Sequence, residues 1–186
     1  MNSQKDGLPT HLFEYVSSIT PMINVDLLVH DPIHGIMLSW RNDKYYGPGW
    51  HIPGGIIRFK ENVITRLRKV AILELNTDSL NNFQLECINQ IMNPSRDVRG
   101  HFISFLYSAK AVKELISNEF VLNQDDTIND YSSGTKKWHK TIPDNLIKQH
   151  RRYIEIMKLK IDNRMNDKIN LGNLNLDYTE NDERQY

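Results

Sequence analysis

Apolar residues along the chain fall into two patterns, short runs that suit strands and wider stripes that suit helices. β-branched and aliphatic runs predict strands at 23–30, 36–41, 83–92 and 101–110. Apolar residues at helical spacing predict a central helix over 61–75. Strands on both sides of a central helix indicate an α/β protein with a mixed sheet between layers of helices.

Weaker patterns predict the remaining elements. A helix over 8–20 would have Thr10 as its cap and an apolar stripe along one side. Residues 111–118 predict a short helix, and 137–139 a last short strand. Pro143 suits the first turn of a closing helix. The stripe of the first helix contains Leu12, Phe13, Val16 and Ile19, and that of the closing helix Leu146, Ile147, His150, Tyr153, Ile154 and Met157.

The length and composition predict one folded domain followed by a polar tail. The chain has 186 residues, of which 39% are hydrophobic and 25% charged, as in ordinary globular proteins. Residues 1–160 are expected to form the domain. Residues 161–186 are rich in Asn and Asp and predict a disordered tail, and the polar stretch 124–136 predicts a mobile loop.

Charge and cysteine content narrow the class of protein. The net charge is zero, which favours neither nucleic acid nor an anionic membrane as a partner. The single cysteine, Cys87, excludes an intramolecular disulfide. No apolar run approaches the roughly 20 residues of a membrane helix. We therefore expect a cytoplasmic protein that binds neither a membrane nor nucleic acid.

The segment with the most chemical information is Gly49-Trp-His-Ile-Pro-Gly-Gly-Ile-Ile-Arg-Phe-Lys-Glu61 and the helix after it, which contains Glu74. It predicts a strand, a Pro-Gly-Gly turn, a loop and an acidic helix start. A glycine in such a turn leaves its carbonyl reachable by a ligand. A carbonyl and an inward carboxylate are the hard oxygen donors that suit Mg²⁺ on a diphosphate.

This segment resembles the Nudix box, G-x5-E-x7-R-E-U-x-E-E-x-G-U. Laid on this chain the pattern meets Gly55, Glu61, Lys69, Val70, Ala71, Leu73, Glu74 and Asn76. Two positions that are often acidic are therefore Val70 and Leu73. The resemblance implies a Nudix-type α/β/α sandwich and a metal held by Glu74 and the Gly55 carbonyl. It also suggests that Lys69 braces the loop from the position of the box arginine, while Glu61 is expected to be structural at the helix start.

The similarity extends beyond the box to the GDP-mannose mannosyl hydrolase branch of the superfamily. The matching stretches are 20–29, 37–41 and 49–55. The branch cleaves the sugar C1–O bond, uses a single helix glutamate and is usually homodimeric. The resemblance implies that Asp26 is a catalytic acid of the first sheet strand and that Arg41 stabilises the departing diphosphate, since a guanidinium fork meets two phosphate oxygens at once.

The chain departs from that branch at three positions. Ile56 stands where an arginine should follow Gly55, and Arg58 or Lys60 could reach a similar place. Ser132 and Ser133 stand where the branch has a metal-binding side chain and a catalytic histidine. His139 and His101 are the candidate bases in its place, because histidine titrates near neutrality. A further candidate base is His51. Further candidate metal ligands are Asp125, Asp126 and Asp130. The candidate substrate contacts are Tyr45 and Tyr46.

Three functions follow from these residues. The first is Mg²⁺-dependent hydrolysis of a nucleotide-diphosphate sugar to the sugar and a nucleoside diphosphate. The second is pyrophosphate hydrolysis of a nucleoside-diphosphate substrate. The third is a degenerate Nudix domain that binds a nucleotide sugar or a partner protein without turnover, which the loss of acids at Val70 and Leu73 favours.

Overall fold

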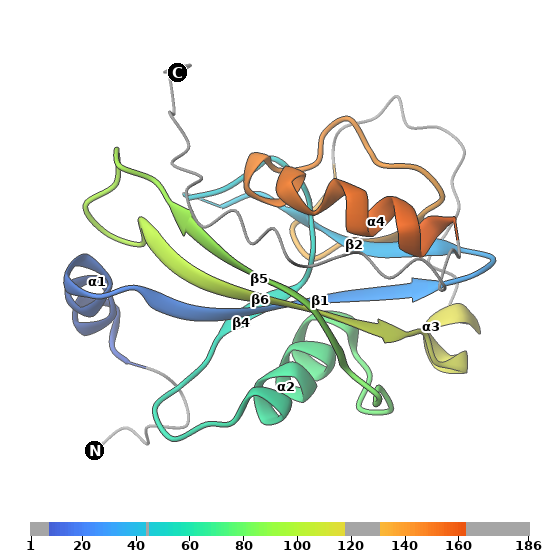
Figure 1. Cartoon of the computed structure of the whole chain (residues 1–186), viewed down its shortest axis with the longest axis horizontal. Coiled ribbons are helices and arrows are strands. Elements are labelled where there is room, and N and C mark those ends of the chain that lie inside the picture. Colours follow the sequence, from blue (N-terminus) through green and yellow to red (C-terminus); the bar gives the residue numbers. More distant parts are fainter. Residues whose placement is uncertain (1–7, 44, 118–130, 163–186) are drawn as a thin grey trace.

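A mixed β-sheet forms the centre of the molecule, and helices cover both of its faces (Figure 1). The computed structural model describes residues 8–43, 45–117 and 131–162. The helices are α1 (Thr10–Ile19), α2 (Val63–Leu75), α3 (Lys113–Ser117), the 3₁₀ helix η2 (Lys148–Tyr153) and α4 (Ile154–Ile161). The strands are β1 (Met22–Asp31), β2 (Gly35–Arg41), β3 (Gly49–His51), β4 (Gly54–Ile56), β5 (Gln84–Met92), β6 (His101–Lys110) and β7 (Lys136–His139). No helix in these ranges is long and apolar enough to cross a membrane.

Strand β1 is the axis of the sheet. The order along the main path is β3-β2-β1-β6-β5, with β4 paired to β1 and β7 paired to β2. β1 runs parallel to β6 from the pair Met22–Phe102 to the pair His30–Lys110, and antiparallel to β2 and β4. The predicted mixed sheet and α/β/α sandwich are therefore confirmed.

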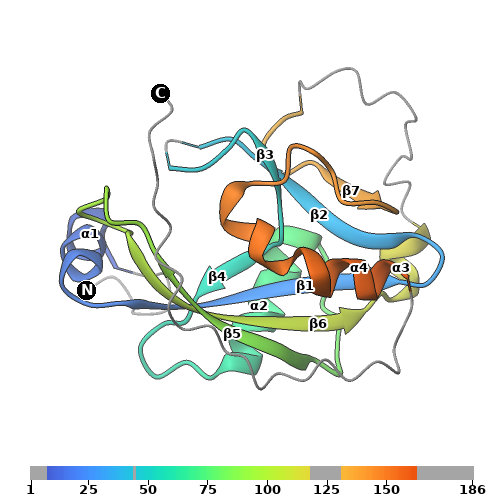
Figure 2. The same cartoon turned by 45° about the horizontal axis from the view of Figure 1, so that its top comes forward.

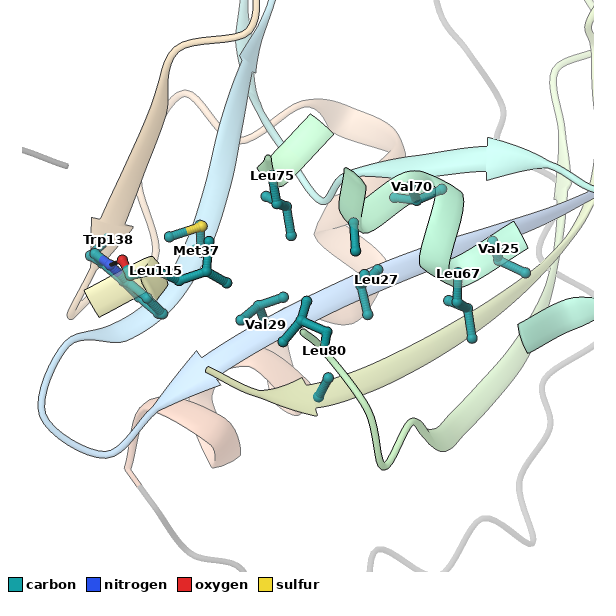
Figure 3. Close-up of a cluster of buried hydrophobic side chains, with 12 residues drawn as sticks. Val25, Leu27, Val29, Met37, Leu67, Val70, Leu75, Leu80, Leu115 and Trp138 are labelled. Carbon is teal, nitrogen blue, oxygen red and sulfur yellow. Dashed lines mark hydrogen bonds between the residues drawn. The ribbon is translucent and has the colours of Figure 1, made fainter. Parts of the chain in front are cut away.

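Two apolar layers hold the helices against the sheet. On one face, α2 packs Leu67, Val70 and Leu75 onto Val25 and Leu27 of β1 (Figure 3). On the other face, η2 and α4 together form the C-terminal segment, residues 148–161. Its Tyr153 and Met157 pack onto Leu28 and Leu38. Figure 2 shows α4 and α2 on opposite sides of β1. Because residues 25–30 of β1 are buried, a polar side chain in this stretch lies deep inside the molecule.

The first and the closing helix differ from the predictions. α1 begins after Pro9 without a side-chain cap, so Thr10 is not its cap. The apolar stripe of α1 is also partly in solvent, since Leu12 and Ile19 are 44% and 64% exposed. Pro143 precedes the closing helix rather than starting it, because a turn and the 3₁₀ helix η2 come first.

The other expected elements lie close to their predicted ranges. Lys136, expected in the mobile loop, is the first residue of β7 and pairs with Ser39. The rest of that loop up to residue 130, with Asp125, Asp126 and Asp130, lies outside the described residues, as does the tail from 163 onward. The division into a domain at 1–160 and a disordered tail therefore stays a prediction.

Helix α2 ends at the position that the box pattern reserves for glycine. Asn76 has φ 57° and ψ 38°, the left-handed conformation, and its N–H bonds to Ala71 O. Asparagine tolerates this conformation better than other residues with a Cβ. Asn76 therefore adopts the left-handed C-cap conformation for which the box pattern has glycine.

We expect Asn76→Ala to lower the free energy of unfolding by about 1 kcal/mol, because alanine adopts the left-handed region at a cost, whereas Asn76→Gly is neutral or slightly stabilising. Urea unfolding of the two variants measures this difference. Asp78→Ala is the matched control, exposed and without a positive φ. Equal stability of the alanine and glycine variants would contradict the capping role.

Candidate active site

A cavity of about 830 Å³ opens where β1, β2, the β3–β4 turn, α2 and the C-terminal segment meet. Its size is in the range of small-molecule sites. Acidic and basic side chains share its wall, so it is suited to a polar, charged ligand. The charged residues and histidines of the lining are Glu14, Asp26, Arg41, Asp43, His51, Arg58, Glu74, Arg99, Lys136 and His150.

The Pro-Gly-Gly turn brings the backbone to the edge of this cavity. A Cβ on Gly54 would lie 2.5 Å from Asp26 Oδ1 and 2.8 Å from Val25 O, so only glycine fits there. The bonds Leu27 N–Pro53 O and Ile57 N–Ile23 O lie on either side of the pair Val25–Gly55. Hydrogen-bonded and non-bonded pairs alternate in an antiparallel ladder. The Gly55 carbonyl is therefore turned toward β1, and the Gly54 carbonyl is turned away from it.

Glu61 joins the loop after this turn to α2. Its carboxylate accepts hydrogen bonds from Arg58 N at 3.0 Å, Arg66 Nε at 2.7 Å and Lys69 Nζ at 2.7 Å, and its side chain is 6% exposed. Burial alone would raise the pKa of Glu61, but these bonds outweigh it and lower the pKa from 4.5 to about 2. Glu61 is thus structural, as expected, and Lys69 makes the expected contact together with Arg66.

Of the box positions on α2, Glu74 is the one whose carboxylate lies at the cavity. Val70 is 3% exposed and belongs to the core, whereas Leu73 is 74% exposed. The side chain of Glu74 is 32% exposed, and its Oε2 lies 3.6 Å from His51 Nε2. The structure thus places Glu74 at the cavity with His51 of β3 as its neighbour, and the role of Glu74 as a metal ligand stays a prediction.

Two histidines of the cavity wall present opposite ring edges. His51 Nδ1 lies 2.7 Å from Ser39 O, and a carbonyl can only accept, so Nδ1 carries the hydrogen. With this hydrogen on Nδ1, Nε2 is the ring nitrogen of His51 that faces Glu74. His150 Nδ1 accepts from Ile52 N at 2.8 Å, which leaves its hydrogen on Nε2. Burial lowers the pKa of His150 well below 6.5, so this ring is neutral.

Asp26 lies beneath the cavity at the centre of β1. Its carboxylate is 3% exposed and accepts from Asn24 Nδ2, Ser104 Oγ and Tyr153 OH. Burial raises the pKa of Asp26, and the three hydrogen-bond donors offset part of this increase. His150 Nε2 is 4.0 Å from Asp26 Oδ1. Because its oxygens are occupied by buried partners, Asp26 is placed to hold the cavity floor in position.

Arg41 and the two tyrosines form one wall of the cavity. Arg41 Nε donates to Asp43 Oδ2 at 2.6 Å, and its guanidinium lies 4.7 Å from the centre of the Tyr46 ring. Tyr45 OH donates to Glu14 Oε1 at 3.0 Å, and Arg99 stacks on the Tyr45 ring at 4.4 Å. Among the described residues no hydrogen bond engages the Nη atoms of Arg41, whereas the faces of both tyrosine rings already contact arginines. Arg58 lines the same cavity.

The candidate bases His101 and His139 are not brought to this cavity. His101 Nε2 lies 2.9 Å from Gln90 Nε2, and the His139 ring packs edge-on against Trp50 at 4.6 Å. Neither is among the described residues that line the cavity, whereas Ser133 is. Sequence reasoning left His150, Arg99 and Lys136 out of the site. Their placement depends on the fold, since Ile52 and His150 are 98 positions apart.

A divalent metal fits this wall with few protein ligands. Among the described residues no three His, Cys, Asp or Glu side chains gather as a metal cluster. Glu74 supplies one carboxylate. The strand pairing turns the carbonyl of Gly54, rather than that of Gly55, away from β1. Mg²⁺ commonly binds through one or two carboxylates together with waters and substrate phosphates. The donor set is therefore adequate when a diphosphate provides the rest.

Comparison with known proteins identifies the fold. No protein-family model and no curated protein matches the chain. Among solved structures, a possible asymmetric diadenosine tetraphosphate hydrolase from Jonesia denitrificans matches with a TM-score of 0.51 and 13% identity, over 81% of this chain and 99% of that one. A MutT protein from Methanosarcina mazei matches at 0.49 and 16%, with the same coverage. A Nudix hydrolase from Nitrosomonas europaea matches at 0.43 and 16%, over 50% of this chain and 60% of its own. The fold is the Nudix α/β/α sandwich.

We expect Glu61→Gln to lower the free energy of unfolding by about 2–3 kcal/mol at pH 7, because the folded protein holds this carboxylate charged down to a pKa of about 2. The unfolded chain binds the proton near pH 4.5, so the stabilisation is complete above that pH and is lost as the pH falls toward 2. The gap between wild type and variant should close over this window. Urea unfolding as a function of pH measures it.

Glu155→Gln is the control for this prediction. Glu155 pairs with Lys158 at 2.8 Å on the surface, where its side chain is 80% exposed. Such a pair contributes about 0–1 kcal/mol. A pH profile for Glu61→Gln that matches that of Glu155→Gln would show that the Glu61 carboxylate does not brace the loop.

Proposed function

We propose that this protein is a metal-dependent hydrolase of a nucleoside-diphosphate derivative, and more specifically of a nucleotide sugar of the GDP-mannose kind. The observation that carries the proposal is the joint placement of Glu74 and Arg41 in one cavity of a Nudix fold. Glu74 comes from the box helix and Arg41 from the end of β2. A carboxylate for a metal and a guanidinium for phosphate are the two charges that a diphosphate ligand requires.

Each side chain has a role that follows from its position. Arg41 binds the diphosphate through its Nη edge, while Asp43 and the Tyr46 ring hold the guanidinium in place. Glu74 and the Gly54 carbonyl would hold the metal. A metal held there would supply positive charge for the leaving diphosphate. His150 presents an N–H to the cavity and is a hydrogen-bond donor to substrate rather than a base.

The sugar end of the substrate is proposed to lie on the side of Tyr45, Tyr46 and Arg58. Arg58 lines the cavity next to Ile56, the position where the related branch has an arginine. The hydroxyl of Tyr45 is held by Glu14 and its ring by Arg99, so this wall is rigid before a ligand arrives. A homodimer remains our expectation from the sequence resemblance, and a cytoplasmic location our expectation from the composition.

A second candidate is binding of the same ligand without turnover. The observation in its favour is that Val70 lies in the core and Leu73 in solvent, so α2 offers the cavity one box carboxylate. Hydrolysis of the bond between the two phosphates needs more positive charge than departure of an intact diphosphate does. The single carboxylate therefore favours cleavage at the sugar C1–O bond over cleavage between the phosphates.

Incubating the protein with nucleotide sugars and a divalent metal, and identifying the products, separates these functions. Free sugar with intact nucleoside diphosphate is the result we expect. Sugar phosphate with nucleoside monophosphate would show pyrophosphate hydrolysis. Binding by calorimetry without any product would show the second candidate. Glu74→Gln should abolish metal-dependent turnover while the melting temperature stays near that of the wild type, and full activity in this variant would place the metal elsewhere.

We expect Arg41→Ala to lower kcat by roughly two to three powers of ten, the effect of removing one preorganised group that stabilises developing charge. Steady-state kinetics on the nucleotide sugar measures this. Arg68→Ala, an exposed arginine of α2, is the matched control and should leave kcat unchanged. A rise in KM with an unchanged kcat would make Arg41 a group that binds substrate and transition state equally.

A further inference from the structure

His51 and Glu74 present two acceptors to one another. The Ser39 carbonyl takes the Nδ1 hydrogen of His51, so the Nε2 lone pair faces the cavity. The Glu74 carboxylate lies 3.6 Å from this lone pair. Two acceptors in this arrangement repel unless a positive charge lies between them, and that charge is either a proton or a metal ion.

The spacing of the pair suits a metal ion. Nitrogen and oxygen donors bind transition metals at about 2.0–2.2 Å. Two donors on one ion, at angles between octahedral and tetrahedral, therefore stand about 3–3.6 Å apart. The separation of His51 Nε2 and Glu74 Oε2 lies at the upper end of this range.

The groups around the pair fix the tautomer of the His51 ring and include one backbone carbonyl. His51 is 8% exposed, and the Ser39 carbonyl fixes its tautomer, as a carbonyl behind a metal-binding histidine does by accepting the other ring hydrogen. The Gly54 carbonyl, turned away from β1, belongs to the turn that follows His51. The His51–Glu74 pair thus offers one nitrogen and one oxygen, and leaves the remaining coordination positions for the Gly54 carbonyl, water or phosphate.

We propose that His51 is a metal ligand together with Glu74, and that this mixed nitrogen and oxygen site takes Mn²⁺, Co²⁺ or Zn²⁺ in preference to Mg²⁺. Imidazole binds these transition ions well, whereas Mg²⁺ prefers a shell of oxygens. The inference rests on the proposed function only in placing a divalent ion beside Glu74. It replaces the Mg²⁺ expected from the sequence with a transition metal.

Lys136 is the group that competes with a metal at this position. It lines the same cavity, and burial lowers its pKa while the nearby Glu74 carboxylate partly opposes that shift. Its ammonium adds positive charge to the cavity wall that also carries Glu74. Removing this ammonium should strengthen metal binding, which a purely structural disturbance of the cavity would not do.

The test is titration of the chelator-treated protein with Mn²⁺ alone, followed by electron paramagnetic resonance, with and without a saturating nucleoside diphosphate. Pulsed measurements on the bound ion report a directly coordinated imidazole nitrogen. The wild type should bind one Mn²⁺ and show this ¹⁴N signal, and Mg²⁺ should displace the ion poorly. The titration contains no cleavable sugar, so a protein that fails as a hydrolase can still satisfy it.

His51→Asn is the decisive variant. The amide nitrogen of asparagine can take the place of Nδ1 and keep the bond to Ser39 O, but asparagine has no counterpart of Nε2. The variant should lose the ¹⁴N signal and bind Mn²⁺ more weakly by about tenfold or more, since removing even a hydrogen-bond partner of a metal ligand costs that much. His11→Asn, on the exposed face of α1, should behave as the wild type, and Lys136→Gln should bind more tightly.

Three results would overturn the proposal: no bound Mn²⁺ in the wild type under either condition, bound Mn²⁺ without a ¹⁴N signal, or wild-type affinity in His51→Asn. The last two would leave His51 as a base or as an ion-pair partner of Glu74. Far-ultraviolet circular dichroism and melting temperatures check that each variant is folded. If His51→Asn does not fold, the ¹⁴N signal of the wild type and the effect of Lys136→Gln decide the question.

Discussion

The buried carboxylate of Asp26 is the interaction on which the arrangement of the site depends. It lies at the middle of β1 and joins this strand to β6 through Ser104 and to the C-terminal segment through Tyr153. It also fills the space that a side chain at Gly54 would need. A buried carboxylate is costly unless donors surround it. The C-terminal segment, β4 and the sheet therefore have to meet at this point, and the cavity lies directly above it.

Different residues around this point hold the loop in place and face the ligand cavity. Glu61 gathers Arg58, Arg66 and Lys69 and fixes the loop to α2. The Pro-Gly-Gly turn exposes a carbonyl, and α2 brings Glu74 to the cavity. The structural charges and the ligand-facing charges are thus carried by different residues. The chain therefore keeps this geometry although Val70 and Leu73 are apolar.

Much of the fold could be predicted from local patterns. The β-branched runs, the Pro-Gly-Gly turn and the stripe of α2 predicted β1, β2, β5, β6 and the central helix close to their observed bounds, because each pattern depends on neighbouring residues. Terminal details were less accessible. The start of the closing helix was placed too early, since Pro143 is compatible with both a helix start and a turn.

The site was predictable only in part, because its geometry depends on register and on distant contacts. Gly55 was chosen from the box pattern, but the pairing of β4 with β1 decides which carbonyl faces outward. Likewise, His101 and His139 are as polar as His51 in sequence, yet only the Ser39 carbonyl and the fold distinguish the ring that faces Glu74. No spacing rule relates His150 to Ile52.

The central claim is that a cation joins His51 and Glu74 at the edge of a diphosphate-binding cavity. Anomalous X-ray diffraction at the manganese absorption edge, from crystals soaked with Mn²⁺ and a nucleoside diphosphate, locates that cation directly. We expect a peak about 2.2 Å from both His51 Nε2 and a Glu74 carboxylate oxygen. A peak bonded to Glu74 and phosphate but beyond bonding distance of His51, or no peak in this cavity, would contradict it.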